Sequence, residues 1–268
     1  AVLTSTQVGA LTDGQVQNAL TTDQVRALTA VAISGLSTTN IERLSAGQVS
    51  VLTSTQVQGL TTRQVAAIEQ ADFPSLATEA IAVLTSSQVA AFRDGQVSAM
   101  TTDQVRVIAT TAISGLTTAS VAMLSTAQLS VLTSTQVSSL GTAQLRALEV
   151  DNRIVGLSTA GIAVLTSTQV RSLSTDEVVA LTTAQVAAMG STQVTGLSTA
   201  QLAAAQAVDL AALATAGIAV LTSAQLSVLN QDQINGLTTT QVSMLTTDAL
   251  IGLSTTGVAA LRTDQVAS

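Results

Sequence analysis

The chain has 268 residues, a net charge of −7 and a narrow composition that is rich in Ala, Val, Leu, Ser, Thr and Gln. It contains no Cys, His, Trp, Tyr or Lys, which excludes disulfides, thiolate or imidazole metal sites and lysine chemistry. Because there is neither a basic stripe nor an aromatic surface for bases, we expect no nucleic-acid partner. The apolar fraction of 47% is typical of a folded protein and predicts an aliphatic core.

An eight-residue unit, the octad, repeats along the whole chain and sets its organisation. Its consensus is Leu-Thr/Ser-Thr/Ser-x-Gln-Val-x-x, and 33 octads can be aligned on their first residue. The octads that begin at Leu11 and Leu148 have nine residues, and the register from Leu157 to Leu261 never slips. Since nothing in the composition suggests a linker, we expect one continuous array over residues 1–268. The absence of an initiator Met and of a leader suggests a fragment of a longer protein.

From the first octad onward, the spacing predicts one short helix in each unit. The second-position hydroxyl is a suitable N-cap, and Gln follows three residues later, as in a capping box; Thr53 with Gln56 and Thr182 with Gln185 show this spacing. A single long helix is excluded, because eight residues advance an α-helix by about 80° beyond two turns and would spread the apolar columns around it. The helix would end in a bend near the next leading Leu.

Charged residues follow the same helical phase. Acidic side chains favour octad positions three and four, where each helix would begin: Asp13, Asp23, Glu79, Asp94, Asp103, Asp176, Asp232, Asp248 and Asp264. Arg favours position seven, near the helix end, as in Arg26 and Arg106. This is the preference of the helix dipole, so it supports the short-helix interpretation.

Further along the chain, one segment interrupts the pattern and the fifth position shows a second period. Pro74, after Glu69–Phe73, predicts a bend or loop. Octads without Gln occur mostly in adjacent pairs, with Glu177 as the exception: Ala32 and Asn40, Asp72 and Ala80, Ala112 and Ser120, Asn152 and Gly161, Asp209 and Gly217, and Ala249 and Gly257. The pairs mark a superrepeat of five octads, about 40 residues, apart from one unit of seven octads. We expect five octads to complete one superhelical coil, with the pairs where coils approach closely.

The predicted fold is therefore an all-α solenoid of very short helices with Leu and Val in its core. A β-solenoid is the alternative, because Val, Ile and Thr favour strands. The apolar spacings of five and three residues, rather than two, favour helices. No run of about eighteen apolar residues occurs, so we expect no membrane insertion.

Catalytic, cofactor-binding and metal-binding residues are not predicted, and we expect no enzyme. Without His there is no Ser-His-Asp triad. The pair Asp176-Glu177 is interpreted as a solvated helix start rather than an acid/base pair. Asp13-Gly14, Asp94-Gly95 and Asn230–Asp232 lack the ligand set of a calcium loop, so they are interpreted as turns.

The octads at Leu3–Val8, Leu52–Val57, Leu132–Val137, Leu165–Val170 and Leu181–Val186 resemble repeats of very large bacterial surface or secreted proteins of the adhesin type. This resemblance implies an extracellular or cell-surface location and a structural role as a rod, spacer or self-associating fibre segment. We expect end-to-end self-association as the main partnership. The alternative is a binding module for a glycan, ice or a protein that uses the Thr/Ser-rich surface; helix capping accounts for these hydroxyls without a ligand.

Overall fold

The computed structural model describes residues 3–268, and within that range every regular element is a helix and no strand occurs. The chain divides into two compact units, residues 1–139 and 140–268. The first contains α1 (Ser5–Gly9), α2 (Asp13–Asn18), α3 (Thr22–Ala27), α4 (Ala30–Ile33), α5 (Thr38–Glu42), α6 (Ala46–Ser50), α7 (Ser54–Gly59), α8 (Thr62–Ala67), the 3₁₀ helix η1 (Phe73–Ser75), α9 (Thr78–Ile81), α10 (Ser86–Ala90), α11 (Asp94–Ala99), α12 (Thr102–Val107), α13 (Thr110–Ile113), α14 (Thr118–Met123), α15 (Thr126–Ser130) and α16 (Ser134–Ser138).

The second unit continues the same series of helices. It contains α17 (Thr142–Arg146), the 3₁₀ segment η2 (Ala147–Gly156), α18 (Thr159–Ala163), α19 (Ser167–Ser172), α20 (Thr175–Ala180), α21 (Thr183–Ala187), α22 (Ser191–Gly196), α23 (Thr199–Ala204), α24 (Ala207–Ala212), α25 (Thr215–Ile218), α26 (Ser223–Leu226), α27 (Gln231–Gly236), α28 (Thr239–Ser243), α29 (Thr247–Leu250), α30 (Thr255–Ala260) and α31 (Thr263–Val266). The all-α repeat array predicted from the sequence is confirmed, and the β-solenoid alternative is wrong for residues 3–268.

Local interactions within each octad explain why the helices are so short. Thr101 precedes α12 in an extended conformation (φ −71°, ψ 158°). Its Oγ1 accepts a hydrogen bond from the backbone N–H of Gln104 at 3.1 Å, and the Oε1 of Gln104 accepts one from the N–H of Thr101 at 3.0 Å. This reciprocal capping box satisfies two N–H groups that have no partner within the helix. The N-caps predicted from the hydroxyl–Gln spacing are thus confirmed.

In many octads the leading apolar residue both ends the preceding helix and enters the core. Leu28 leaves α3 in an extended conformation (φ −65°, ψ 140°), and Leu60 does so after α7 (φ −70°, ψ 140°). Both side chains are buried, as is Val57 in the sixth-position column. Helices of four to six residues are unstable alone, so burial of these columns between stacked octads must supply the stability.

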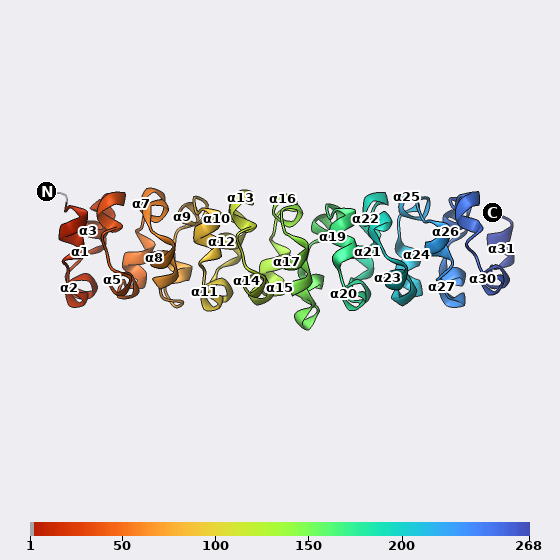
Figure 1. Cartoon of the computed structure of the whole chain (residues 1–268), viewed down its shortest axis with the longest axis horizontal. Coiled ribbons are helices and arrows are strands. Elements are labelled where there is room, and N and C mark those ends of the chain that lie inside the picture. The colour runs from red at the N-terminus through yellow and green to blue at the C-terminus, as the bar shows by residue number, and fades with distance from the viewer. Residues whose placement is uncertain (1–2) are drawn as a thin grey trace. The chain divides into compact units, whose positions relative to one another are not determined.

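Stacking follows a shorter period than the sequence suggested. Within the first unit, α4 contacts α7 and α5 contacts α8; within the second, α19 contacts α22 and α24 contacts α27. Figure 1 shows α10, α13 and α16 along one edge of the first unit, and α19, α22 and α25 along one edge of the second. Fifth-position glutamines bond carbonyls 28 and 31 residues earlier, so one turn spans between three and four octads. The expected five-octad coil is wrong; the five-octad superrepeat belongs to the sequence and not to the stacking.

Small residues allow close contact between stacked octads. At Gly217, in the fifth-position column, a Cβ atom would lie 2.8 Å from Cγ2 of Val194. At Gly115, just before a leading Leu, a Cβ atom would overlap the carbonyl oxygen of Ser86. The expectation that octads without Gln allow close approach therefore holds at Gly217. The glycine at the eighth position is a second close-approach site that the sequence pattern did not single out.

Two irregular segments interrupt the series. Around Pro74 the octad forms the 3₁₀ helix η1 instead of an α-helix, and the ring of Phe73 packs edge-on against Phe92 at 5.1 Å. The nine-residue octad at Leu148 places Asp151 and Asn152 in the left-handed region (φ 55° and 52°) within η2. The interruption expected at Pro74 is present, and it takes the form of this 3₁₀ helix.

Candidate functional site

The most regular polar feature of the structure is a column of buried glutamines. Gln104 is only 1% exposed. Its Oε1 accepts the capping bond described above, while its Nε2 donates to the carbonyl oxygens of Phe73 at 3.1 Å and Leu76 at 2.8 Å. One side chain therefore accepts a hydrogen bond at the start of its own helix and donates hydrogen bonds to carbonyls at the end of an octad in the preceding turn. We call this arrangement the glutamine latch.

The latch recurs in both units with nearly constant geometry. Gln136 donates to Val105 and Ile108 at 3.1 and 2.7 Å, and Gln201 donates to Val170 and Leu173 at 3.0 and 2.7 Å. Other glutamines that bond both their own N-cap and carbonyls of the preceding turn include Gln48, Gln56, Gln64, Gln88, Gln96, Gln128, Gln169, Gln185, Gln193, Gln225, Gln233, Gln241 and Gln265. The last carbonyls of a helix lack partners within it, so these amides satisfy groups that would otherwise be buried unpaired.

The comparison with protein families agrees with this repeat unit. The family described as the ALTTAQ repeat matches residues 65–102 and 206–239. Both segments resemble the ALTTAQ repeat. The letters themselves occur outside these segments, at residues 180–185, where Thr182 caps α21 and Gln185 bonds Leu157 at 2.6 Å. At residues 180–185 these letters contain the leading Leu, the N-cap hydroxyl and the latch amide of one octad. No curated protein matches the chain.

The sequence predicted the capping bond of the fifth-position glutamine but not its bonds to carbonyls of the preceding turn. A capping box accepts Glu as readily as Gln at the third helical position. The strong preference for Gln here was the available signal, because only the amide carries N–H donors for the carbonyls of another octad.

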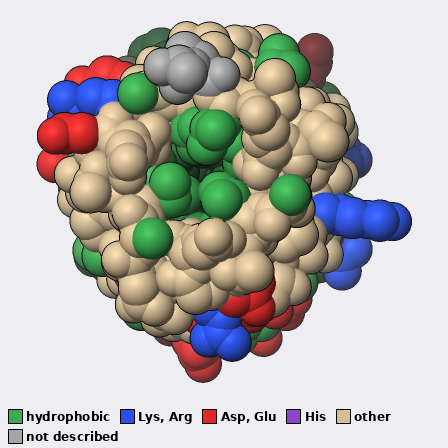
Figure 2. Space-filling view, turned by 90° about the vertical axis from the view of Figure 1, so that its left-hand side faces the viewer, with side chains coloured by type: hydrophobic (Ala, Val, Ile, Leu, Met, Phe, Trp, Pro, Cys, Tyr) green, Lys and Arg blue, Asp and Glu red, His purple; other side chains and the backbone are tan. Residues whose placement is uncertain are grey.

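At the N-terminal end of the first unit the latch is incomplete. Gln7, Gln15 and Gln24 are exposed; each Oε1 accepts its capping bond, and no Nε2 bond to residues 3–268 occurs. Figure 2 looks onto this end and shows hydrophobic side chains gathered at its centre, with acidic and basic side chains at the rim. Among the described residues at the other end of the chain, the carbonyls of Val242 and Leu245 receive no glutamine bond, although they hold the acceptor positions of the latch.

The only adjacent carboxylate pair in the sequence is Asp176-Glu177, and the two side chains have different environments in the structure. Asp176 is exposed, as expected of a solvated helix start. Glu177 is 0% exposed, so that interpretation is wrong for this residue. It occupies the latch position of its octad: its Oε2 accepts from the backbone N–H of Ser174 at 2.8 Å, and its buried Oε1 has no hydrogen-bond partner in the part of the chain that the structure describes. Burial raises the pKa of Glu177 above its ordinary value of 4.5.

The calcium-like segments form ordinary repeat structure. Oδ1 of Asp13 accepts a hydrogen bond from Nδ2 of Asn40 at 3.1 Å, which links two octads. Oδ1 of Asn230 accepts from the N–H of Gln233 at 2.9 Å and caps α27. Across residues 3–268, no group of three or more acidic side chains is placed to hold a metal ion. In the same residues, no helix is both long and apolar enough to span a bilayer.

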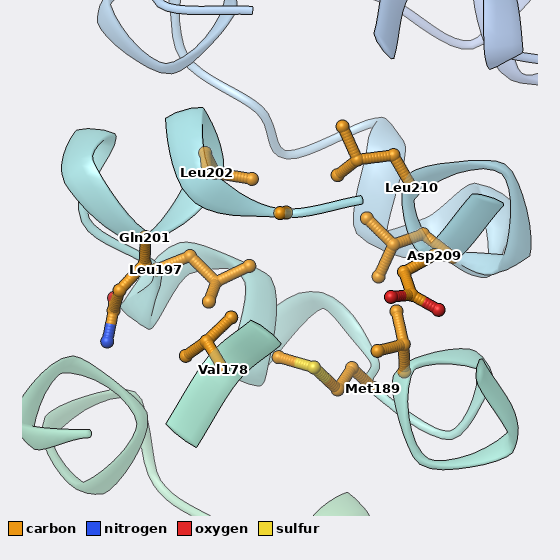
Figure 3. A pocket seen from close by; sticks show the side chains of 10 residues that line it. Val178, Met189, Leu197, Gln201, Leu202, Asp209 and Leu210 are labelled. Atoms are coloured by element: carbon orange, nitrogen blue, oxygen red, sulfur yellow. The ribbon is translucent and has the colours of Figure 1, made fainter. Parts of the chain in front are cut away.

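One small cavity lies inside the second unit. Its volume is about 20 Å³, and its walls include Val178, Met189, Leu197 and Leu210 (Figure 3). Ala205 borders it and is the single leading position in the array without a large side chain. The cavity is therefore explained by a missing Leu side chain and has room for about one water molecule.

Proposed function

We propose that the chain is a non-enzymatic structural repeat segment, a rod or spacer, of a bacterial surface or secreted adhesin-like protein. The single observation that carries this proposal is the glutamine latch. Each octad satisfies carbonyls of the preceding turn and leaves its own for the next, so octads can be added without enlarging the core. This is the requirement of a protein whose task is to set a length. The resemblance of the octads to repeats of such proteins supports the secreted or surface location.

A binding role for the Thr and Ser hydroxyls is less well supported. Shallow hollows do occur between stacked octads, one of them lined by Thr61, Thr62 and Arg63. The hydroxyl of Thr61 already accepts from Gln64 N–H at 3.2 Å and donates to its Oε1 at 2.9 Å. Such hydroxyls serve the fold, which favours the structural role over glycan or ice binding.

The same proposal includes end-to-end self-association. The free amides of Gln7, Gln15 and Gln24 are donors, and carbonyls such as those of Val242 and Leu245 are the complementary acceptors. Joining them would continue the latch from one copy to the next and would cover the apolar centre visible in Figure 2. A head-to-tail contact joins two different surfaces and can repeat from copy to copy, so we expect it to produce linear oligomers.

Sedimentation velocity and electron microscopy over a range of concentrations test this step. We expect linear oligomers that grow with concentration. The triple variant Gln7→Glu, Gln15→Glu and Gln24→Glu keeps the capping oxygens and removes the donors, so we expect it to remain monomeric. A charge-matched control replaces the exposed Gln17, Gln58 and Gln70 with Glu and is expected to assemble like the unmodified chain. An unmodified chain that stays monomeric at every concentration contradicts the assembly proposal.

The location and the spacer role need separate measurements. Antibody labelling of intact and permeabilised cells of the source organism tests the surface location, and labelling only after permeabilisation contradicts it. Small-angle scattering of chains with added or removed turns of the array tests the spacer role. We expect the maximum dimension to grow in proportion to the number of turns, and a constant dimension contradicts a length-setting function.

A further inference from the structure

Glu177 differs from every glutamine of the latch in one chemical respect. An amide always carries donors, whereas a carboxyl group carries one only when it is protonated. Glu177 keeps the acceptor half of the latch, since its Oε2 accepts from Ser174 N–H at 2.8 Å. Because Oε2 takes the place of a latch Oε1, we infer that Oε1 takes the place of Nε2. It is buried and has no hydrogen-bond partner among residues 3–268.

The register identifies what this oxygen faces. Gln169, one octad earlier, donates to the carbonyl of Leu140 at 2.8 Å. If this pattern is shifted by one octad, the corresponding acceptors for residue 177 are the carbonyls of Leu148 and Leu145. The contact between α20 and η2 agrees with this assignment. A carboxylate oxygen against carbonyl oxygens is repulsive, while a carboxylic acid O–H in the same place donates a hydrogen bond. Geometry therefore favours the neutral acid.

We propose that Glu177 is a proton-dependent joint in the array. Its carboxyl group is neutral in the folded chain and donates from Oε1 to the carbonyls at the end of α17 and the start of η2. When it ionises, the donor is lost, a buried charge faces those carbonyls, and the stacking of α20 on residues 145–148 loosens. The complete latches found in residues 3–268 are made by Gln, whose amide does not titrate, so the pH response is expected where α20 stacks on η2.

Nearby charged side chains shift the pKa of Glu177 in both directions. From η2, Glu149 raises the pKa of Glu177, while Arg146 at the end of α17 lowers it; the dominant cause of the upward shift is burial. The other charges on η2, Asp151 and Arg153, form an ion pair at 3.6 Å. The other neighbour of α20, α23, has the sequence Thr-Ala-Gln-Leu-Ala-Ala and carries no titratable side chain.

The sign of the pH dependence follows from linkage. A folded-state pKa above 4.5 means that the folded chain binds the proton more tightly than the unfolded chain. The stabilising contribution is complete below pH 4.5 and is lost as the pH rises through the folded-state pKa. Glu177→Gln supplies permanent donors and removes this dependence.

The experiment combines infrared spectroscopy with thermal melts of the full chain. The difference spectrum between the unmodified chain and Glu177→Gln at pH 7 is expected to show the C=O band of a protonated carboxyl group. The same difference for Asp176→Asn, on the exposed neighbour, is expected to show a carboxylate. In melts, Glu177→Gln is expected to raise the melting temperature more at pH 8 than at pH 4.5, and Asp176→Asn is expected to show no such increase.

A transplanted joint gives an independent check. Gln201→Glu places a carboxyl group in a complete latch, against Val170 and Leu173. In the Glu177→Gln background it is expected to restore a melting temperature that falls between pH 4.5 and pH 8. A carboxylate band for Glu177 at pH 7, or a melting-temperature difference for Glu177→Gln that is equal at both pH values, overturns the proposal.

Discussion

The Nε2 of Gln104 lies 2.8 Å from the carbonyl oxygen of Leu76, although 28 residues separate them. This bond joins the start of α12 to the end of η1 in the preceding turn. Because the same glutamine also caps its own helix, one residue type couples local folding to stacking. Loss of either partner leaves a buried polar group, which costs more than an exposed hydrogen bond contributes.

The first prediction compares two glutamines in nearly identical octads. Gln24 and Gln104 both lie in the sequence Thr-Thr-Asp-Gln-Val-Arg, but Gln24 is exposed and has only the capping half of the latch. Gln104→Ala is expected to lower the free energy of unfolding by about 1–3 kcal/mol more than Gln24→Ala, the cost of unpaired buried carbonyls. Denaturant unfolding followed by circular dichroism measures both. Equal losses would mean that the bond between turns contributes nothing.

The second prediction concerns close contact at glycine. In Gly115→Ala the new methyl group overlaps the carbonyl of Ser86, so α10 and the end of α13 must move apart. We expect a loss of about 1–3 kcal/mol. Gly14 lies in α2, and a methyl group added there would have no other atom within 4 Å, so Gly14→Ala is expected to stabilise by about 0.5–1 kcal/mol through helix propensity. Thermal melts of both variants check the opposite signs.

Local features were predictable from the sequence, and relations between turns were not. The N-cap at Thr53 and its partner Gln56 depend on residues three apart, and a single octad contains all the information. The stacking period depends on the angle at which each extended leading residue redirects the chain. A composition pattern does not record that angle, so the five-octad superrepeat does not reveal how many octads complete one turn.

The buried state of Glu177 was unpredictable for a related reason. An acid at the third helical position is ordinarily solvated and favoured by the helix dipole, as Asp176 illustrates one residue earlier. Burial follows only from knowing that the fifth octad position faces the preceding turn. Gln occupies the fifth position in 20 of 33 octads. Once the contact with the preceding turn is known, this preference indicates that the fifth-position side chain is buried.

The third prediction is a pH dependence at Asp72, the acid in the fifth-position column of the first unit. Burial, with a smaller contribution from Glu69, raises the pKa of Asp72 above its ordinary value of 3.8. The proton therefore stabilises the folded state, and this contribution is lost as the pH rises above 3.8 through the folded-state pKa. Asp72→Asn is expected to be more stable than the unmodified chain at pH 7 and to lose that advantage at pH 3. The exposed Glu79, replaced by Gln, is the control; an advantage of Asp72→Asn that is the same at both pH values would contradict the prediction.

The fourth prediction tests whether the cavity beside Ala205 is a packing defect. Every other leading position carries Leu, Ile, Met or Phe, and the space lined by Val178, Met189 and Leu210 is what the missing side chain leaves. Ala205→Leu is expected to stabilise the second unit by about 0.5–2 kcal/mol, as cavity-filling substitutions commonly do. Ala203→Leu, on the exposed face of the preceding helix, adds the same atoms without filling the cavity and is expected to change stability by less than about 0.5 kcal/mol. Denaturant unfolding of the two variants measures both changes. A loss of stability in Ala205→Leu would contradict the prediction and would show that the fold requires a small residue at this position.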